Sequence, residues 1–530
     1  MCRTDHKLAS NLICFAAVFA ISAVGHAQWS DDPSVNLTVD DREGMQTEPQ
    51  ICPTSDGGCY ASWFDDVESG YDVYLQRLDA AGYAQWAHNG IRIAERSNTW
   101  CANHGMAVDA EDHAVIIFRD IRDGFDQIVA MRISPEGELV WGAGGVQLTN
   151  NDLDWPFVGT PRVDVASDGS ILVGWTLEPN VYLHRLDHAG NAVWEEAVVI
   201  SDDQDRVINL CEIHASDAGS VIASWTTMDC PRHLFAQKID TDGNALWVED
   251  REGRRRGGVV VYDGGALPMG YFPPFVTDGM GGAVFAWYGT SPALQCYAQH
   301  VMADGRERFP HNGVEVSTNM YRTRVTPAVS FDALTRETYV FWREQAFQPT
   351  RYGLYGQKLS EDGTRQWTDE GRAILPLGDT DVSQIRTLPT QDGAMVFFCA
   401  APPSDEYSVQ AVRVDGEGQI AWDDGFVMLA DRASHRLRAV MSAYDIALLA
   451  WAGAVTGDQD IIAQNVHGDG TLGLRYADVN ADGVVDIDDV FAVLGDWGPC
   501  PDPPAACPAD VDESGVVDID DLFEVLANWS

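Results

Sequence analysis

Basic residues and long apolar segments are both scarce in this sequence. Lys and Arg total 34 against 81 Asp and Glu, which gives a formal net charge of −47. Because nucleic-acid binding depends on a basic surface, this balance excludes nucleic acid as the main partner. Beyond the N-terminal segment no run of about 18 apolar residues occurs, so no transmembrane segment is expected in the mature chain.

Short catalytic motifs are also missing. The sequence contains no H-E-x-x-H, no G-x-S-x-G and no P-loop pattern, and its 13 histidines are scattered. Asp and Glu are so frequent that a pair of carboxylates says little about glycoside hydrolysis. Hydrophobic residues nevertheless make up 45% of the chain, which excludes a disordered protein. Enzymatic activity is therefore left open, and no catalytic residue is assigned.

The N-terminus has the pattern of a secretory signal peptide. Arg3 and Lys7 precede an apolar run over residues 12–24, and Gly25-His26-Ala27 places small residues before Gln28. We predict cleavage after residue 27 and a secreted or cell-surface protein; a buried N-terminal helix is the alternative. Nine cysteines then remain, and an odd number leaves at least one without an intrachain partner.

A repeat organises most of the chain. At 530 residues the chain is too long for one hydrophobic core, because single cores stop growing near roughly 250–300 residues. Eight apolar runs that end in an aromatic residue recur at intervals of about 55 residues. These anchor aromatics are Trp63, Phe118, Trp175, Trp225, Trp287, Trp342, Phe398 and Trp451.

Each repeat contains four short runs with the two-residue periodicity of β-strands. After the third run, a turn such as Asp79–Gly82 opens with Asp or Ser and ends with Gly, and an aromatic such as Trp86 follows. Four-stranded units repeated in a ring form a β-propeller, which closes on itself. We therefore predict a mainly β fold, an eight-unit β-propeller of four-stranded blades, over residues 28–474. A linear β-solenoid is the alternative.

The ends of the repeat region predict how the ring closes. The eighth unit has only three strands of its own, while Gln28-Trp29 and the following strand at residues 35–39 resemble Gln85-Trp86 and its strand. We expect the N-terminal strand to complete the last blade. The alternative is that residues 28–45 form a loose leader.

The repeats resemble those of secreted bacterial propeller-like proteins. The resemblance rests on the anchor Trp followed by a D-x-x-x-G-x-D loop, present here as Asp66-Gly70-Asp72 and Asp120-Gly124-Asp126. It covers about residues 45–470. It implies an architecture and no particular activity, because such folds support many functions.

The last 54 residues, 477–530, differ in composition and contain two calcium-loop motifs. They hold twelve Asp, two Glu and no Lys or Arg. Oxygen ligands at loop positions 1, 3, 5, 9 and 12, a backbone carbonyl at position 7 and Gly at position 6 suit Ca²⁺. The expected ligands are Asp478, Asn480, Asp482, Val484, Asp486 and Asp489 in the first loop, and Asp510, Asp512, Ser514, Val516, Asp518 and Asp521 in the second.

Two such loops, each followed by a short apolar helix, resemble a dockerin type I domain. The resemblance implies two calcium ions, folding coupled to calcium binding, and docking to a cohesin-like or other surface scaffold protein. The sequence departs from the family at loop positions 10 and 11, where Ile487-Asp488 and Ile519-Asp520 replace the usual Ser or Thr. A simple acidic tail is the alternative.

Cys500 and Cys507 flank a proline-rich linker between the two loops. A disulfide between them is expected in an oxidising compartment. Free thiols or a metal site are the alternatives, although two ligands make a poor metal site.

One face of the propeller has the composition of a recognition surface. In an antiparallel blade, the loops that follow strands two and four emerge on the same side. These loops carry Trp100, Trp155, Tyr271, Tyr321, Asp65 and Asp120. Flat aromatics beside carboxylates suit a sugar polymer. The alternative is that these aromatics fill the gaps between blades.

Three functions remain open from the sequence. We favour a secreted protein whose propeller binds an extracellular polymer, with polysaccharide as the expected ligand, and whose calcium-binding module acts as a tether. The second is a polysaccharide-degrading enzyme, a glycoside hydrolase or lyase, on the same scaffold. The third is a structural or protein-interaction module of the cell surface.

Overall fold

The computed structural model describes residues 28–67, 70–96, 104–152, 157–202, 204–247, 258–291, 293–403, 407–431, 434–453, 459–475, 477–501, 507–511 and 514–529. Within these ranges, no helix combines the length and hydrophobicity needed to cross a membrane.

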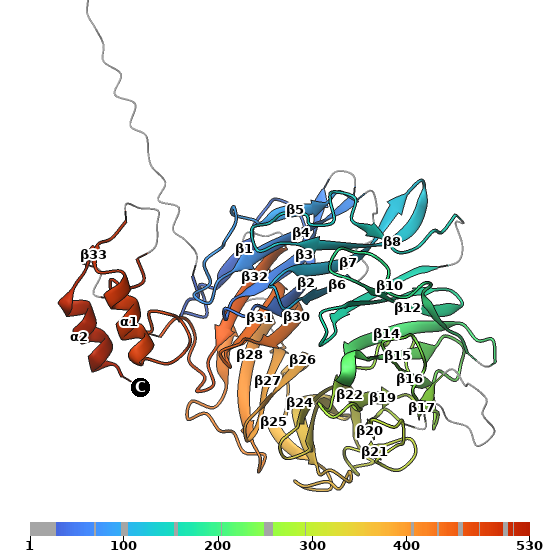
Figure 1. The fold of residues 1–530 in the computed structure, drawn as a ribbon. Helices are drawn as coiled ribbons and strands as arrows, with labels where there is room; N and C mark the ends of the chain where they lie inside the picture. The colour runs from blue at the N-terminus through green and yellow to red at the C-terminus, as the bar shows by residue number, and fades with distance from the viewer. Residues whose placement is uncertain are drawn as a thin grey trace, which may run out of the picture.

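Eight four-stranded antiparallel sheets are arranged as the blades of a propeller (Figure 1), as the repeat predicted. The first four blades comprise β2 (Gln46–Pro53), β3 (Cys59–Val67), β4 (Gly70–Leu78) and β5 (Ile91–Ala94); β6 (Gly105–Val108), β7 (Ala114–Arg122), β8 (Phe125–Ile133) and β9 (Val146–Gln147); β10 (Val158–Val165), β11 (Ile171–Leu177), β12 (Asn180–Leu186) and β13 (Val198–Ile200); and β14 (Ile208–Ala215), β15 (Val221–Thr227), β16 (Leu234–Ile239) and β17 (Val259–Tyr262).

The remaining blades comprise β18 (Phe275–Thr277), β19 (Ala283–Gly289), β20 (Gln295–Val301) and β21 (Val314–Glu315); β22 (Thr323–Asp332), β23 (Glu337–Ala346), β24 (Arg351–Leu359) and β25 (Arg372–Gly378); β26 (Asp381–Thr390), β27 (Gly393–Ala401), β28 (Ser408–Asp415) and β29 (Val427–Ala430); and β30 (Ser434–Met441), β31 (Ala447–Gly453), β32 (Asp460–Val466) and β1 (Leu37–Asp40). A 3-10 turn, η1 (Asp217–Gly219), connects β14 and β15.

The core lies between neighbouring blades. The second strand of each blade is covered on both faces, and β15 and β31 are buried at every residue. This explains why the anchor runs are continuously apolar while the other strands alternate. The first strands of neighbouring blades contact one another and therefore surround the propeller axis.

The N-terminal segment closes the ring. β1 is the outer strand of the eighth blade and pairs antiparallel with β32, Leu37 opposite Ala463 and Thr38 opposite Ile462. Trp29 is buried, with 2% of its surface exposed. Nε2 of Gln464 donates a 3.0 Å hydrogen bond to the carbonyl of Ser30, which holds the segment ahead of the strand.

A tryptophan from each of seven blades is hydrogen-bonded to the next blade. Its indole Nε1 donates to a carbonyl in the glycine turn that follows the third strand of that blade. These pairs are Trp29–Ala80, Trp86–Pro135, Trp141–His188, Trp194–Thr241, Trp247–Ala303, Trp367–Gly416 and Trp422–Gly468, at 2.7–3.2 Å. Phe309 occupies the place of the tryptophan in the remaining blade, against Gly363.

The C-terminal residues form two helices and a two-residue strand pair. α1 (Ile487–Gly495) and α2 (Ile519–Ala527) are joined through β33 (Gly498–Pro499) and β34 (Val516–Val517), which pair with each other. A disulfide links Cys500 to Cys507, as the sequence predicted. A small separate core of valines and alanines lies between the helices, with Val493, Val517 and Val525 fully buried.

Candidate functional site

The two C-terminal loops have nearly the same backbone. Gly483 and Gly515, at loop position 6, have φ angles of +89° and +87°, which glycine adopts without strain. Asp486 and Asp518 cap α1 and α2 with φ angles of −143° and −144°, and each accepts a hydrogen bond from the backbone N–H two residues on. The duplication read from the sequence is therefore a duplication of structure.

The last residue of each loop is a buried carboxylate. Asp489 and Asp521 have no exposed surface. Oδ1 of Asp489 accepts from the N–H of Val479 at 2.7 Å, and its Oδ2 accepts from the N–H of Asp486 at 2.8 Å, so the side chain ties both ends of the loop together. In the second loop Oδ2 of Asp521 accepts from the N–H of Asp518 at 2.7 Å.

Negative charge accumulates in the first loop. Burial, together with the nearby carboxylates of Asp489 and Asp482, raises the pKa of Asp478 to about 6. No Lys or Arg occurs in residues 477–530 to offset these charges. Carboxylate, amide and backbone oxygens are the donors that Ca²⁺ prefers, so the chemistry of the loop residues fits this ion.

The loop carboxylates are held by backbone hydrogen bonds. Oδ1 and Oδ2 of Asp478 accept from the N–H groups of Asp482 and Gly483, at 3.1 and 2.8 Å. Asp510 does the same with Ser514 and Gly515, at 2.9 and 2.7 Å. The hydroxyl of Ser514 also donates to the carbonyl of Val516 at 3.1 Å. Asp512, a predicted ligand of the second loop, lies outside the described residues.

Within the described ranges, two groups of three metal-ligating side chains place their ligand atoms within 4.8 Å of one another, and neither is a calcium loop. One comprises Cys500, Cys507 and Asp510, but its sulfur atoms form the disulfide. The other comprises Asp109, Glu111 and His188. Nη2 of Arg132 forms ion pairs with Asp109 at 2.7 Å and Glu111 at 2.9 Å, so its charge is already partly offset.

Four of the six residues of the expected polymer-binding face lie in the described part of the chain. Trp100 and Trp155 lie outside the described residues. Tyr321 is 86% exposed. The ring of Tyr271 contacts that of Tyr288, with centroids 4.5 Å apart, and burial of its hydroxyl raises its pKa well above the usual value. Tyr271 therefore packs between structural elements, as the alternative interpretation expected.

Asp65 and Asp120 are both buried and bonded to neighbouring side chains. Oδ1 of Asp65 accepts from Nε2 of Gln46 at 2.8 Å, and its Oδ2 lies 3.3 Å from Nη1 of Arg42. Asp120 forms an ion pair of 3.2 Å with Arg122. Neither carboxylate is presented to solvent as a free hydrogen-bonding group.

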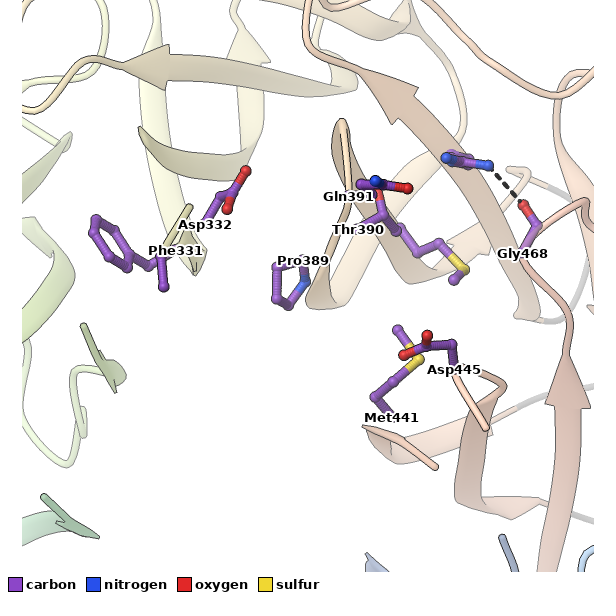
Figure 2. Close-up of a pocket in the computed structure, with 11 residues that line it drawn as sticks. Phe331, Asp332, Pro389, Thr390, Gln391, Met441, Asp445 and Gly468 are labelled. Carbon is purple, nitrogen blue, oxygen red and sulfur yellow. Dashed lines mark hydrogen bonds between the residues drawn. The ribbon is translucent and has the colours of Figure 1, made fainter. Parts of the chain in front are cut away.

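A cavity of about 450 Å³ lies on the side of the propeller opposite the expected polymer-binding face, where the hairpins between first and second strands emerge (Figure 2). Blades six, seven and eight each contribute one hairpin. Its apolar lining is Phe331, Ala333, Pro389, Met395 and Met441, and its polar lining includes Asp332, Thr390, Gln391, Arg413 and Asp445. Figure 2 shows Pro389 between Asp332 on one side and Asp445 on the other.

Two polar groups of this cavity have fixed roles in the hairpins. Oδ1 of Asp332 accepts from the N–H of Leu334 at 2.8 Å, and its Oδ2 accepts from the hydroxyl of Thr335 at 2.9 Å. Arg413 donates to the carbonyl of Gly468 at 3.1 Å and to Asp392 at 2.7 Å. A second cavity of about 370 Å³ adjoins the first and shares Asp332 and Gln391 with it.

The sequence did not reveal these cavity residues. Each hairpin reads as an ordinary turn, and the cavity exists only because three hairpins about 55 residues apart meet in space. The repeat period could have aligned the hairpins. It could not have shown which of the eight positions leave space between them.

No family model and no curated protein sequence matches this chain. Solved structures with a similar chain course include the GH93 α-L-arabinofuranosidase of Fusarium graminearum in complex with arabinobiose, at 12% identity and a TM-score of 0.34, over 58% of this chain and 93% of that one. The polysaccharide lyase Uly1 matches at 8% identity and a TM-score of 0.41, over 83% of this chain and 97% of that one. A eukaryotic initiation factor matches at 9% identity with the same TM-score, over 84% and 93%.

Proposed function

We propose that this chain is a secreted propeller protein that binds an extracellular polysaccharide and is held in place by a calcium-dependent, dockerin-like tether. The observation that supports the tether best is a duplicated apolar surface on the C-terminal helices. Phe491 on α1 is 60% exposed, and Phe523 at the equivalent position of α2 is 58% exposed. Large apolar side chains exposed in a contiguous set mark a surface that binds another protein.

The apolar surface is repeated residue by residue. Its members are Ile487, Phe491, Leu494 and Trp497 from the first half, and Ile519, Phe523, Leu526 and Trp529 from the second, each exposed by between 45% and 60%. Ile487 and Ile519 stand at loop position 10, where typical dockerins carry Ser or Thr. The partner we propose is therefore a cohesin-like surface scaffold protein with a more apolar face.

Calcium binding is the proposed condition for this surface. The loops contain buried carboxylates that no basic residue of the module offsets. Two Ca²⁺ ions would supply the missing positive charge and order the N-termini of both helices, so calcium binding and folding would be coupled. The signal-peptide pattern and the disulfide support an extracellular location, where calcium is abundant.

Polysaccharide binding is proposed for the propeller because of the cavity on its hairpin side. An apolar wall that includes Phe331, Pro389 and Met441 lies beside the side chains of Gln391 and Asp445, and this combination suits a sugar ring and its hydroxyl groups. The full-length protein should be tested by affinity electrophoresis against a panel of neutral and acidic polysaccharides. Retardation by one class of glycan, lost in the variant Met441→Glu and kept in Met269→Glu, is the expected result.

A polysaccharide-degrading enzyme is the second candidate, because two carboxylates, Asp332 and Asp445, line one cavity. Hydrolysis of a glycosidic bond requires such a pair. A reducing-sugar assay on the same glycan panel separates the two functions. Release of reducing ends that Asp445→Asn abolishes would favour the enzyme; binding without release would favour the carbohydrate-binding protein.

The tether is tested separately with the surface proteins of the source organism. Wild-type chain is compared with the double variant Phe491→Asp/Phe523→Asp, each in calcium and in chelator. One partner captured by the wild type in calcium alone supports the proposal. Equal capture by both proteins would overturn it.

A further inference from the structure

One layer of strands around the propeller axis carries three arginines. The layer is defined by pairing: each member lies opposite the residue immediately before the anchor aromatic of its blade. Arg162 on β10 lies opposite Gly174, Arg386 on β26 opposite Phe397, and Arg438 on β30 opposite Ala450. Other members of this layer are Gln50, Gly105, Glu212 and Ala328.

A bulge precedes each of the three arginines. The pairing register of β10, β26 and β30 shifts immediately before Arg162, Arg386 and Arg438. The residues two positions earlier, Thr160, Gln384 and Arg436, have φ angles of +47°, +54° and +62°. The same bulge precedes Gln50 and Ala328, where Glu48 and Thr326 have φ angles of +54° and +51°, so it is a feature of the repeat that sets the direction of the side chains in this layer.

Two of the arginines form no ion pair or hydrogen bond with a carboxylate in the described part of the chain. Nη1 of Arg386 donates to the carbonyl of Ile385 at 2.8 Å. Nε of Arg438 donates to Oε1 of Gln50 at 3.2 Å. Arg162, in contrast, forms an ion pair of 3.0 Å with Glu212.

The surrounding charges leave an excess of positive charge. Arg436 forms an ion pair with Glu48 at 2.8 Å. Asp164, two residues after Arg162 on β10, lies 3.6 Å from His214 on β14. Arg386 and Arg438 form no direct ion pair in the described part of the chain, although Glu212 lies near enough to favour the charged form of both and Glu48 that of Arg438. Burial, with the charge of Arg438 beside it, lowers the pKa of Arg386 to about 10, and burial also lowers the pKa of Arg438. A chain with a net charge of −47 thus keeps two arginines on adjacent blades that have no direct ion pair in the described part of the chain.

We propose that Arg386 and Arg438 form a binding site for an oxyanion group on the propeller axis. Planar guanidinium groups bind the oxygens of sulfate, phosphate and carboxylate through paired hydrogen bonds, and one anion between two arginines removes their mutual repulsion. The oxyanion is either a free ion or an acidic substituent of a larger ligand. The site is independent of the calcium module and of the proposed tether.

The position of the site allows both sources. Pro389 and Met441, which line the cavity of Figure 2, lie three residues beyond Arg386 and Arg438 on the same two strands. At 3.2–3.4 Å per residue this is roughly 10 Å, about the length of two sugar rings. A ligand in the cavity that carries an acidic group could therefore place it near the arginines.

The test uses full-length protein and titration calorimetry at constant ionic strength. The probes are sodium sulfate as the free ion, a galacturonic acid trisaccharide as the acidic ligand, and galactotriose as its neutral counterpart. We expect sulfate or the acidic trisaccharide to bind, and Arg386→Gln or Arg438→Gln to weaken binding at least tenfold. The acidic trisaccharide binding more tightly than sulfate identifies a carbohydrate substituent; the reverse order identifies a free ion.

The control is Arg306→Gln, which removes an exposed arginine and should leave binding unchanged. A melting curve without any oxyanion distinguishes a ligand site from a structural role. Arg386→Gln relieves repulsion with Arg438, so its melting temperature should equal or exceed that of the wild type. The proposal would be overturned if neither sulfate nor the galacturonic acid trisaccharide bound to the protein. It would also be overturned if the wild type and the variants bound equally, or if Arg386→Gln clearly lowered the melting temperature. Arg386→Lys, which keeps the charge but not the paired hydrogen bonds, should bind with intermediate affinity.

Discussion

The indole Nε1 of Trp29 donates a 2.8 Å hydrogen bond to the carbonyl of Ala80, and this contact joins the N-terminal segment to the first blade. The equivalent bond between Trp86 and Pro135 measures 3.2 Å and joins the first blade to the second. Trp29 therefore acts as the tryptophan of the eighth blade, although it lies more than 400 residues in sequence from β30, β31 and β32 of that blade.

The first prediction concerns this closure. Trp29→Ala removes a buried indole and its hydrogen bond, which should lower the free energy of unfolding by about 3–5 kcal/mol. Trp529→Ala is the matched control, because that side chain lies just beyond α2 and is about half exposed. Thermal unfolding of the two variants checks the expectation, and an equal loss of stability in both would contradict it. Deletion of residues 28–42 should be more damaging still, since it exposes the edge of β32.

The second prediction separates backbone strain from inter-blade contact. Gly82 has a φ of +87°, and a Cβ there would lie 2.8 Å from the backbone nitrogen of Trp29. Gly142 has a φ of +75° with no atom within 4 Å of its Cβ position. Gly142→Ala should cost about 1–2 kcal/mol from the left-handed backbone alone. Gly82→Ala should cost an additional 1–3 kcal/mol or so from overpacking. Chemical denaturation measures both, and indistinguishable values would show that the contact is unimportant.

The third prediction concerns calcium. The full-length wild type should bind two Ca²⁺ ions in calorimetry, with the second loop weaker because Ser514 replaces a carboxylate at position 5. Asp489→Ala should abolish the first site, and Asp521→Ala the second. Asp496→Ala removes an exposed carboxylate just outside the loops and should leave both sites intact. Fewer than two ions bound to the wild type would contradict the dockerin resemblance.

The fourth prediction is a pH dependence at the ring closure. Burial raises the pKa of Asp40 on β1 to about 6, although Arg42 forms an ion pair with it at 2.8 Å and Trp63 Nε1 donates to its Oδ2 at 2.6 Å. Because this folded-state pKa lies above the unfolded value of 3.8, the folded protein binds the proton more tightly. The contribution of Asp40 to stability is therefore greatest below pH 4 and falls as the pH rises to 6.

Asp40→Asn mimics the protonated side chain and should remove this dependence. The stability of the variant relative to wild type should rise by on the order of 2 kcal/mol between pH 4 and pH 7. The difference between the two proteins is the quantity to measure, because the many other carboxylates titrate equally in both. A difference that stays constant across this range would show that Asp40 keeps an ordinary pKa.

The sequence predicted the fold well because the repeat reports burial directly. Each anchor run is continuously apolar since β3, β15, β31 and their equivalents are covered on both faces. Gln28-Trp29 matched Gln85-Trp86 because both hold the same turn of the next blade. The closure of the ring was thus readable from two residues.

The arginine layer and the cavity were not readable. A glycine in the sequence often marks the position of a bulge, but here Gln384 and Arg436 adopt the positive φ angles. Each bulge shifts the pairing register of its strand, and so it changes which residues of neighbouring blades lie in the same layer. The repeat alone therefore could not place Arg386 and Arg438 in one layer. The expected aromatic face could not be predicted reliably either, because the sequence places Tyr271 in a loop whereas its ring packs against that of Tyr288.

The eighth blade also determines how the molecule would bear a mechanical load. Its third strand, β32, is the last strand of the propeller before the C-terminal helices, while its outer neighbour β1 comes from the other end of the chain. A pull transmitted through the C-terminal helices would therefore reach the propeller at β32. There it would act on the hydrogen bonds to β31 and β1 together, along the length of the strands. The junction between β1 and β32 would be the first part of the propeller to be loaded by shear flow, and Trp29 would help to hold it closed.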